Sequence, residues 1–177
     1  VFVEPFTPSI ESVLKTNFLI ESRLKKKLDT EIIQAACDDK KGFERLINHT
    51  KPVAGETYNS VENGISDYCD GGRQKMSKKS FQWIKKVTLD EVFMDMKVEP
   101  PTHIKVDVDG LEMRVLRGGK QVMKYEGLLE CAIEVNDNNP KLVDEFMKNV
   151  GFIKFDEYIH HDLKDKFTAD FFYKRRN

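Results

Sequence analysis

Six acidic side chains stand where predicted β-strands end, and carboxylates at that position can bind a ligand. They are Glu4, Asp38, Asp107, Asp109, Glu134 and Asp137, and Asn136 lies beside the last of them. In an open α/β sheet, ligands bind beyond the carboxyl ends of the strands. A carboxylate has two acceptor oxygens, so it can accept hydrogen bonds from both hydroxyls of a ribose. One such residue alone would fit a solvated carboxylate equally well, but their repetition indicates a site for an adenosine-containing ligand.

Alternating strand and helix patterns supply the elements that would position these side chains. Thr7 as N-cap and Pro8 at the first helical position begin a helix in which Ile10, Leu14 and Phe18 share a face. A capping box at Thr88 begins a short helix over 89–96. Helices also follow around 111–116 and from Pro140 to a stop at Gly151. Strands are predicted at 1–3, 32–37, 81–87 (an edge strand), 104–108, 128–135, 152–158 and 170–174.

This order of elements predicts one α/β domain over residues 1–177, with a doubly wound, mostly parallel sheet. Residues 48–79 are rich in Gly, Ser, Asn, Asp and Lys and form a variable loop or a hairpin excursion. Trp83 and the twelve phenylalanines are interpreted as core residues.

Composition excludes several classes of protein. Among 177 residues, 40% are hydrophobic and 33% are charged, and no apolar run is long enough to span a membrane. The 29 basic and 30 acidic residues give a net charge of −1, which argues against nucleic-acid binding. Cys37, Cys69 and Cys131 are too scattered for a zinc site or a disulfide framework, so a cytoplasmic location is expected.

Three blocks of sequence carry a resemblance to a known family. They are Val87-Thr88-Leu89-Asp90-Glu91, then 104–112 (IKVDVDGLE) with 115–119 (VLRGG), and then Ile133-Glu134-Val135. Val3-Glu4-Pro5 and 35–39 (AACDD) fit two further strand ends. In these blocks the chain resembles the FkbM-type methyltransferases, which use S-adenosylmethionine. The resemblance covers nearly the whole chain and is weaker over 48–79.

The resemblance implies a Rossmann-like sheet, S-adenosylmethionine as cofactor, and methyl transfer to a hydroxyl of a sugar or small molecule. Glu4 would hold the ribose diol, and Asp38 would approach the adenine amino group. Asp107 would border both the sulfonium and the incoming hydroxyl, and it is the first choice for a base or substrate orienter. Lys105 and Glu134 are the second choices.

The sequence departs from the family in one respect. Family members begin with a strand and a glycine-rich turn that wraps the methionine part of the cofactor, and no such segment precedes Val1 here. In the family sheet that strand lies between the strands that end at Glu4 and at Asp107. We therefore expect that this chain is a piece of a longer protein with an incomplete cofactor site. A homodimer formed by strand exchange would be another way to fill the gap.

Other interpretations were weighed against the methyltransferase. Asp107-Val108-Asp109-Gly110 imitates part of a calcium loop, but Leu116 stands where the bidentate Glu belongs. Mg²⁺ bridging Asp107, Glu134 and Asn136 is a better variant, although no metal site is assigned. Glu112 is interpreted as a partner of the helix dipole, and His160-His161 as surface residues. A non-catalytic binding or scaffold domain with a degenerate cofactor site remains the alternative function.

Overall fold

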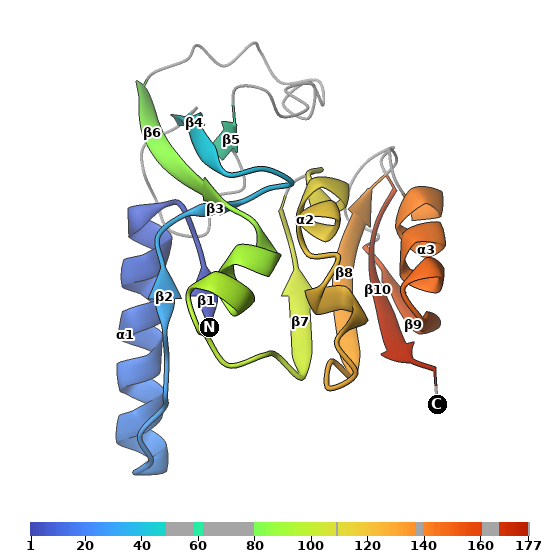
Figure 1. The fold of residues 1–177 in the computed structure, drawn as a ribbon. Coiled ribbons are helices and arrows are strands. Elements are labelled where there is room, and N and C mark those ends of the chain that lie inside the picture. Colours follow the sequence, from blue (N-terminus) through green and yellow to red (C-terminus); the bar gives the residue numbers. More distant parts are fainter. Residues whose placement is uncertain (49–58, 62–79, 109, 137–139, 161–166, 177) are drawn as a thin grey trace. The chain divides into compact units, whose positions relative to one another are not determined.

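The computed structural model describes residues 1–48, 59–61, 80–108, 110–136, 140–160 and 167–176. Figure 1 shows the described elements coloured along the chain. They cluster into two compact units, which are described separately. The first unit consists of Val1–Cys37 and Lys41–Val87, and the second of Asp38–Lys40 and Thr88–Asn177.

The first unit begins with a small β-α-β arrangement. Strand β1 (Phe2–Val3) pairs in parallel with β2 (Ile32–Ile33), and helix α1 (Thr7–Leu24) connects them. The N-cap of α1 is Phe6, so the prediction that Thr7 is the N-cap was wrong by one residue; the Thr7 hydroxyl instead accepts a hydrogen bond from Gln34. No residue of α1 is buried, and the predicted apolar face is largely exposed.

The rest of the first unit is a four-stranded mixed sheet. It contains β3 (Ala36–Cys37), β4 (Gly42–Asn48), β5 (Asn59–Val61) and β6 (Ser80–Val87), in the order β3-β6-β4-β5. Only the β3–β6 pair is parallel. The strand predicted over 32–37 is divided in two because the Ala35 N–H bonds back to the Ile33 carbonyl, a tight turn that redirects the chain. The predicted edge strand over 81–87 was also misplaced, since β6 is an inner strand.

Over residues 43–46 of β4 and 81–85 of β6, only one of the two strand faces is buried. Leu46 and Ile84 are buried, whereas Phe43, Phe81 and Trp83 on the other face are exposed. The prediction that Trp83 and all phenylalanines belong to the core was therefore wrong, because alternation separates the two faces of a strand without saying which one is covered.

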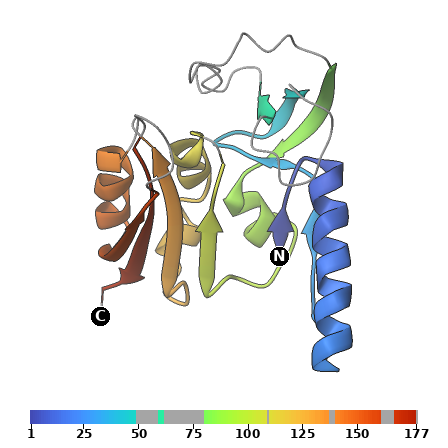
Figure 2. The same ribbon diagram turned by 180° about the vertical axis from the view of Figure 1, so that it is seen from behind.

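The second unit contains a four-stranded sheet flanked by helices (Figures 1 and 2). Its strands are β7 (His103–Val106), β8 (Glu130–Asn136), β9 (Phe152–Ile159) and β10 (Thr168–Arg175), in the order β7-β8-β10-β9. Its helical segments are η2 (Glu91–Asp95), α2 (Glu112–Gly118), η3 (Val122–Lys124) and α3 (Pro140–Asn149).

The prediction of a mostly parallel sheet was wrong, because the described sheets are mixed. In the second unit β7 and β8 are parallel, but β10 is antiparallel to both β8 and β9. The reason is the short last connection: only residues 160–167 join β9 to β10, which lies between β8 and β9. Parallel neighbours need a crossover of about a dozen residues or more, so a connection of this length favours antiparallel neighbours.

The core of the second unit lies between one face of this sheet and the helices α2 and α3. Its buried side chains are Val115 and Leu116 of α2, Val143 and Met147 of α3, Cys131, Ile133 and Val135 of β8, and Ala169, Phe171 and Tyr173 of β10. The Tyr173 hydroxyl donates a hydrogen bond to Asp144 Oδ1 at 2.8 Å, which ties α3 to this face. Burial raises the pKa of Tyr173, and it raises the pKa of the Cys131 thiol to about 12.

Side-chain hydrogen bonds fix the start of the helical segment that precedes β7 and the start of the helical turn η3. Thr88 Oγ1 accepts the N–H of Glu91 at 3.0 Å, which confirms the predicted cap. The Asp90 carboxylate accepts the N–H groups of Gln121 and Val122, so a residue of the first sequence block that carries the family resemblance positions the start of η3 after α2.

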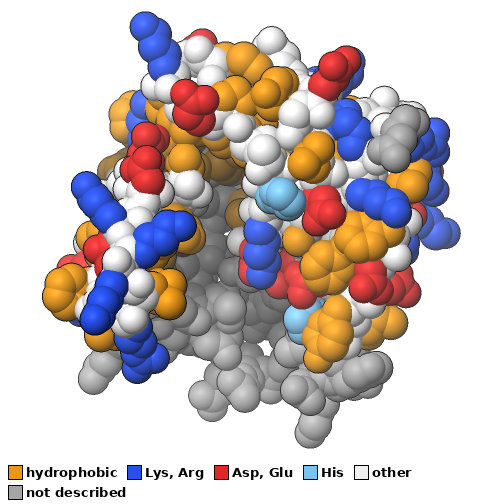
Figure 3. All heavy atoms as spheres, turned by 90° about the horizontal axis from the view of Figure 1, so that it is seen from below, with side chains coloured by type: hydrophobic (Ala, Val, Ile, Leu, Met, Phe, Trp, Pro, Cys, Tyr) orange, Lys and Arg blue, Asp and Glu red, His pale blue; other side chains and the backbone are white. Residues whose placement is uncertain are grey.

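The described surface carries charges of both signs. Figure 3 shows Lys and Arg side chains intermixed with Asp and Glu side chains, with hydrophobic side chains exposed between them. None of the helices that the structure describes has the length and hydropathy needed to cross a membrane.

Candidate functional site

An ion pair stands where β7 ends. Lys105 and Asp107 point away from the buried side of the sheet, and Lys105 Nζ lies 2.9 Å from Asp107 Oδ2. The hydrogen bond to Asp107 is the main cause that raises the pKa of Lys105. The negative charges of Asp107, Asp170 and Glu134 act in the same direction, and partial desolvation opposes them. Lys105 is therefore an ammonium group among three carboxylates.

The neighbouring strands supply the rest of this group. Glu134 of β8 is the register partner of Asp170 of β10, so both side chains lie on the face that carries Lys105. His160 Nε2 lies 3.0 Å from Asp170 Oδ2. The other oxygen of this carboxylate, Oδ1, is buried and has no hydrogen-bond partner among the described residues. We call Lys105, Asp107, Glu134, His160 and Asp170 the acid cluster.

The charges of the acid cluster limit what each member can do. Because its pKa is raised, Lys105 is protonated near neutral pH and cannot accept a proton there. It can orient the Asp107 carboxylate and offer positive charge to an oxygen. Asp107, about half exposed, is the carboxylate that a hydroxyl-bearing molecule could reach. The cluster can therefore accept a proton through Asp107 and hold polar groups through its other members.

Glu4 belongs to the first unit and follows β1. Its Oε1 accepts the N–H of Phe6 at 2.8 Å, and its own N–H donates to the Ile33 carbonyl. Within the described residues, Oε2 of Glu4 has no hydrogen-bond partner. Partial burial raises the pKa of Glu4, and the Phe6 hydrogen bond opposes that shift. A half-buried carboxylate with one oxygen to spare fits a ligand that brings hydroxyl donors.

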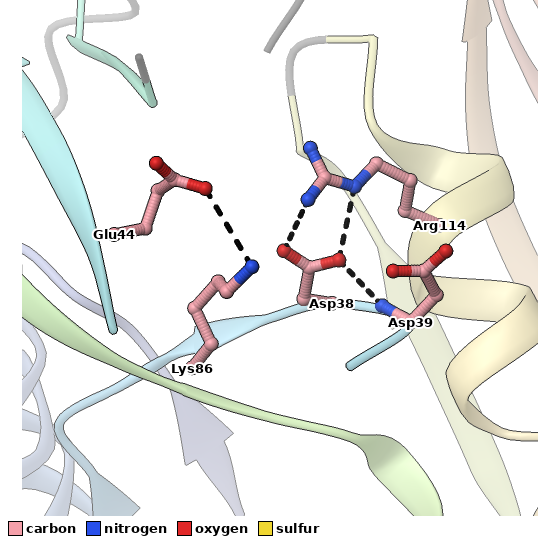
Figure 4. Close-up of polar contacts among 5 residues, drawn as sticks. All are labelled: Asp38, Asp39, Glu44, Lys86 and Arg114. Carbon is pink, nitrogen blue, oxygen red and sulfur yellow. Dashed lines mark hydrogen bonds and ion pairs between the residues drawn. The ribbon is translucent and has the colours of Figure 1, made fainter. Parts of the chain in front are cut away.

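Asp38 is engaged within the protein. Its carboxylate is buried and accepts two hydrogen bonds from Arg114, Nε to Oδ1 at 2.9 Å and Nη2 to Oδ2 at 2.5 Å (Figure 4). The N–H of Asp39 also donates to Oδ1. A Cβ at Gly118 would lie 2.1 Å from the Asp38 carbonyl oxygen, so α2 packs directly on this segment. This geometry makes Asp38 an anchor for α2, and its contact with adenine stays a prediction.

The metal variant finds no support in the part of the chain that the structure describes, where no three His, Cys, Asp or Glu side chains come together as ligands. Asp109, Asp137 and His161 lie outside the described residues, as does the side chain of Asn136. Glu112 is buried and accepts the N–H of Gly110 at the start of α2, which agrees with the expected role at the helix start.

Sequence reasoning missed two residues that shape the candidate site, Arg114 and Asp170. Arg114 lies between the two segments of the second family block, 104–112 and 115–119, but nothing in its spacing indicates a partner 76 positions earlier. Asp170 is on an antiparallel strand, so a search restricted to the ends of parallel strands passes over it. The polar residues that alternate with Ala169, Phe171 and Tyr173 were the signal that could have found it.

Comparison with known proteins gives one finding about family. A family model described as the methyltransferase FkbM domain matches residues 1–154. No match was found among curated proteins or among solved structures.

Proposed function

The chain belongs to the methyltransferase FkbM domain family, and on that premise we propose that it is an S-adenosylmethionine-dependent enzyme that methylates a hydroxyl of a sugar or small molecule. The observation that carries the proposal is the Lys105–Asp107 pair at the end of parallel strand β7. Ligands of open α/β sheets bind at this end of parallel strands.

The environment of Glu4 fits a role in binding the ribose of the cofactor. The unpartnered Oε2 can accept a hydrogen bond from a ribose hydroxyl, and such a charge-assisted bond would offset the cost of burying this carboxylate. When bound, S-adenosylmethionine would supply an electrophilic methyl group, with its sulfur as the leaving group that keeps the electron pair of the carbon–sulfur bond.

Asp107 and Lys105 have different roles toward the acceptor hydroxyl. Asp107 accepts the proton of the acceptor hydroxyl as its oxygen attacks, because an oxygen that loses its proton is a better nucleophile. Lys105 keeps the Asp107 carboxylate in one orientation through the 2.9 Å contact. Most of the rate enhancement then comes from alignment of the acceptor oxygen with the methyl group.

Calorimetric titration of S-adenosylhomocysteine into the protein tests the cofactor assignment. Glu4→Ala removes the carboxylate that would hold the ribose, so affinity falls by about 1–3 kcal/mol. Glu11→Ala, which changes an exposed carboxylate of α1, leaves the affinity unchanged. Equal affinity of both variants would remove Glu4 from the site. An absence of heat at high micromolar ligand would favour the alternative, a non-catalytic scaffold domain.

A further inference from the structure

Strands β4 and β6 display aromatic side chains on one exposed face. Phe43, Phe81 and Trp83 are 72%, 61% and 65% exposed. Phe43 is on β4 and the other two are on β6, at alternate positions that point to the same side of the sheet. Exposed aromatic patches of this kind on a folded sheet mark interaction sites.

Two cations lie between the rings. Arg45 is the register partner of Trp83, and Lys85 is the partner of Phe43. The Cζ atom of Arg45 is 5.2 Å from the centroid of the Phe81 ring and 6.0 Å from that of Trp83. These distances are in the range of cation–π attraction, which restrains the rings. We call Phe43, Arg45, Phe81, Trp83 and Lys85 the aromatic face.

The opposite face of the same strands is covered, so the aromatic face has a fixed backbone beneath it. Leu46 and Ile84 are each 4% exposed, and Glu44 is 6% exposed. Lys86 Nζ lies 3.5 Å from Glu44 Oε2 on that covered side (Figure 4). A ligand on the aromatic face would therefore meet a surface that is already ordered, and binding would lose little entropy in ordering it.

We propose that the aromatic face binds an acidic carbohydrate. One side of a sugar ring presents C–H groups with slight positive charge, and the π face of an aromatic ring is negative, so the two stack. Three exposed rings on two neighbouring strands suit successive sugar units. Arg45 and Lys85 complement the carboxylates of an acidic sugar, since a guanidinium and an ammonium both donate to carboxylate oxygens.

A saccharide is favoured over a nucleic acid, which could also stack on aromatic rings. A nucleic acid carries one phosphate for each base and needs a basic groove along its backbone. The aromatic face has two cations for three rings, and the whole chain has a net charge of −1. The binding of a saccharide to the aromatic face does not rest on the proposed function.

Binding of three probes to the protein, measured by calorimetry without cofactor, tests the proposal. The probes are a hexamer of galacturonic acid, a hexamer of N-acetylglucosamine as the neutral sugar of the same length, and a dodecamer of thymidylate. We expect the acidic hexamer to bind at least fivefold more tightly than either of the others. Trp83→Ala weakens that binding at least tenfold, and Trp83→Phe, which keeps a ring, stays within threefold of the unchanged protein.

Phe18→Ala is the matched control, because Phe18 is a 70% exposed aromatic residue on α1. It leaves binding within twofold, and circular dichroism confirms that each variant is folded. The proposal is overturned if the acidic hexamer does not bind, if Trp83→Ala binds it as well as Phe18→Ala does, or if either other probe binds more tightly. Loss of S-adenosylhomocysteine binding with retained saccharide binding would overturn the proposed function and leave the aromatic face assigned.

Discussion

At the scale of single residues, Asp107 has an exposed carboxylate held by one cation. Asp107→Asn leaves the shape of the side chain but removes its capacity to take a proton, so kcat falls by about 10²–10⁴-fold. The affinity for S-adenosylhomocysteine stays within about twofold because this product carries no sulfonium charge. The pKa of Lys105 also falls toward its ordinary value, since its main partner loses its charge.

Single-turnover kinetics and an NMR titration of the Lys105 side chain check these expectations. Asp156→Asn is the control, because Asp156 is an exposed carboxylate on β9 of the same unit. A fall in kcat of equal size in both variants would show that Asp107 has no special role in methyl transfer.

Arg114 is expected to matter for stability. Arg114→Met leaves the buried Asp38 carboxylate without the guanidinium that accompanies it, and breaking a buried pair in this way costs about 3–5 kcal/mol. Arg117→Met on the same helix changes an exposed residue and costs less than about 1 kcal/mol. Urea denaturation measures both values. Similar midpoints for the two variants would mean that the Asp38–Arg114 pair does not anchor α2.

At the scale of elements, Thr88 begins the helical segment before β7. Thr88→Ala removes the acceptor of the Glu91 N–H, and loss of an N-cap costs about 0.5–2 kcal/mol. Thr102→Ala is the control because the Thr102 side chain is exposed and its hydroxyl lies in hydrogen-bond distance, 3.0 Å, of Nδ1 of His103. Thermal unfolding followed by circular dichroism compares them, and an unchanged midpoint for Thr88→Ala would contradict the cap.

Local signals predicted some elements well. Pro140 and Gly151 bracket α3 as expected, because a proline fits the first turn and Gly151 adopts a φ of +92°. Strand β4 went unpredicted because its support comes from β5 and β6, which are distant in sequence. The same limit explains the wrong prediction for the burial of Trp83, since the sequence of a strand does not identify the residues that pack on each of its faces.

At the scale of the whole molecule, the order of elements could be predicted but not the way strands pair. The sequence contains strands at 152–158 and 170–174, and nothing local to them says that β10 inserts beside β8. The acidic strand ends were similarly visible in the sequence. Their environments were not, because the Asp38–Arg114 contact and the Glu134–Asp170 register arise only when the sheet and helices assemble.

The buried Cys131 offers a chemical reporter of how this molecule opens. With a pKa of about 12, its thiol is ionised to only about 1 part in 10⁴ at pH 8, and the side chain is 2% exposed. Iodoacetamide should therefore alkylate this position only during excursions in which β8 is uncovered. The alkylation rate at Cys131, followed by peptide mass spectrometry against urea concentration, then measures the free energy of those excursions. Fast alkylation in native buffer would mean that the second unit opens locally far more often than its packing indicates.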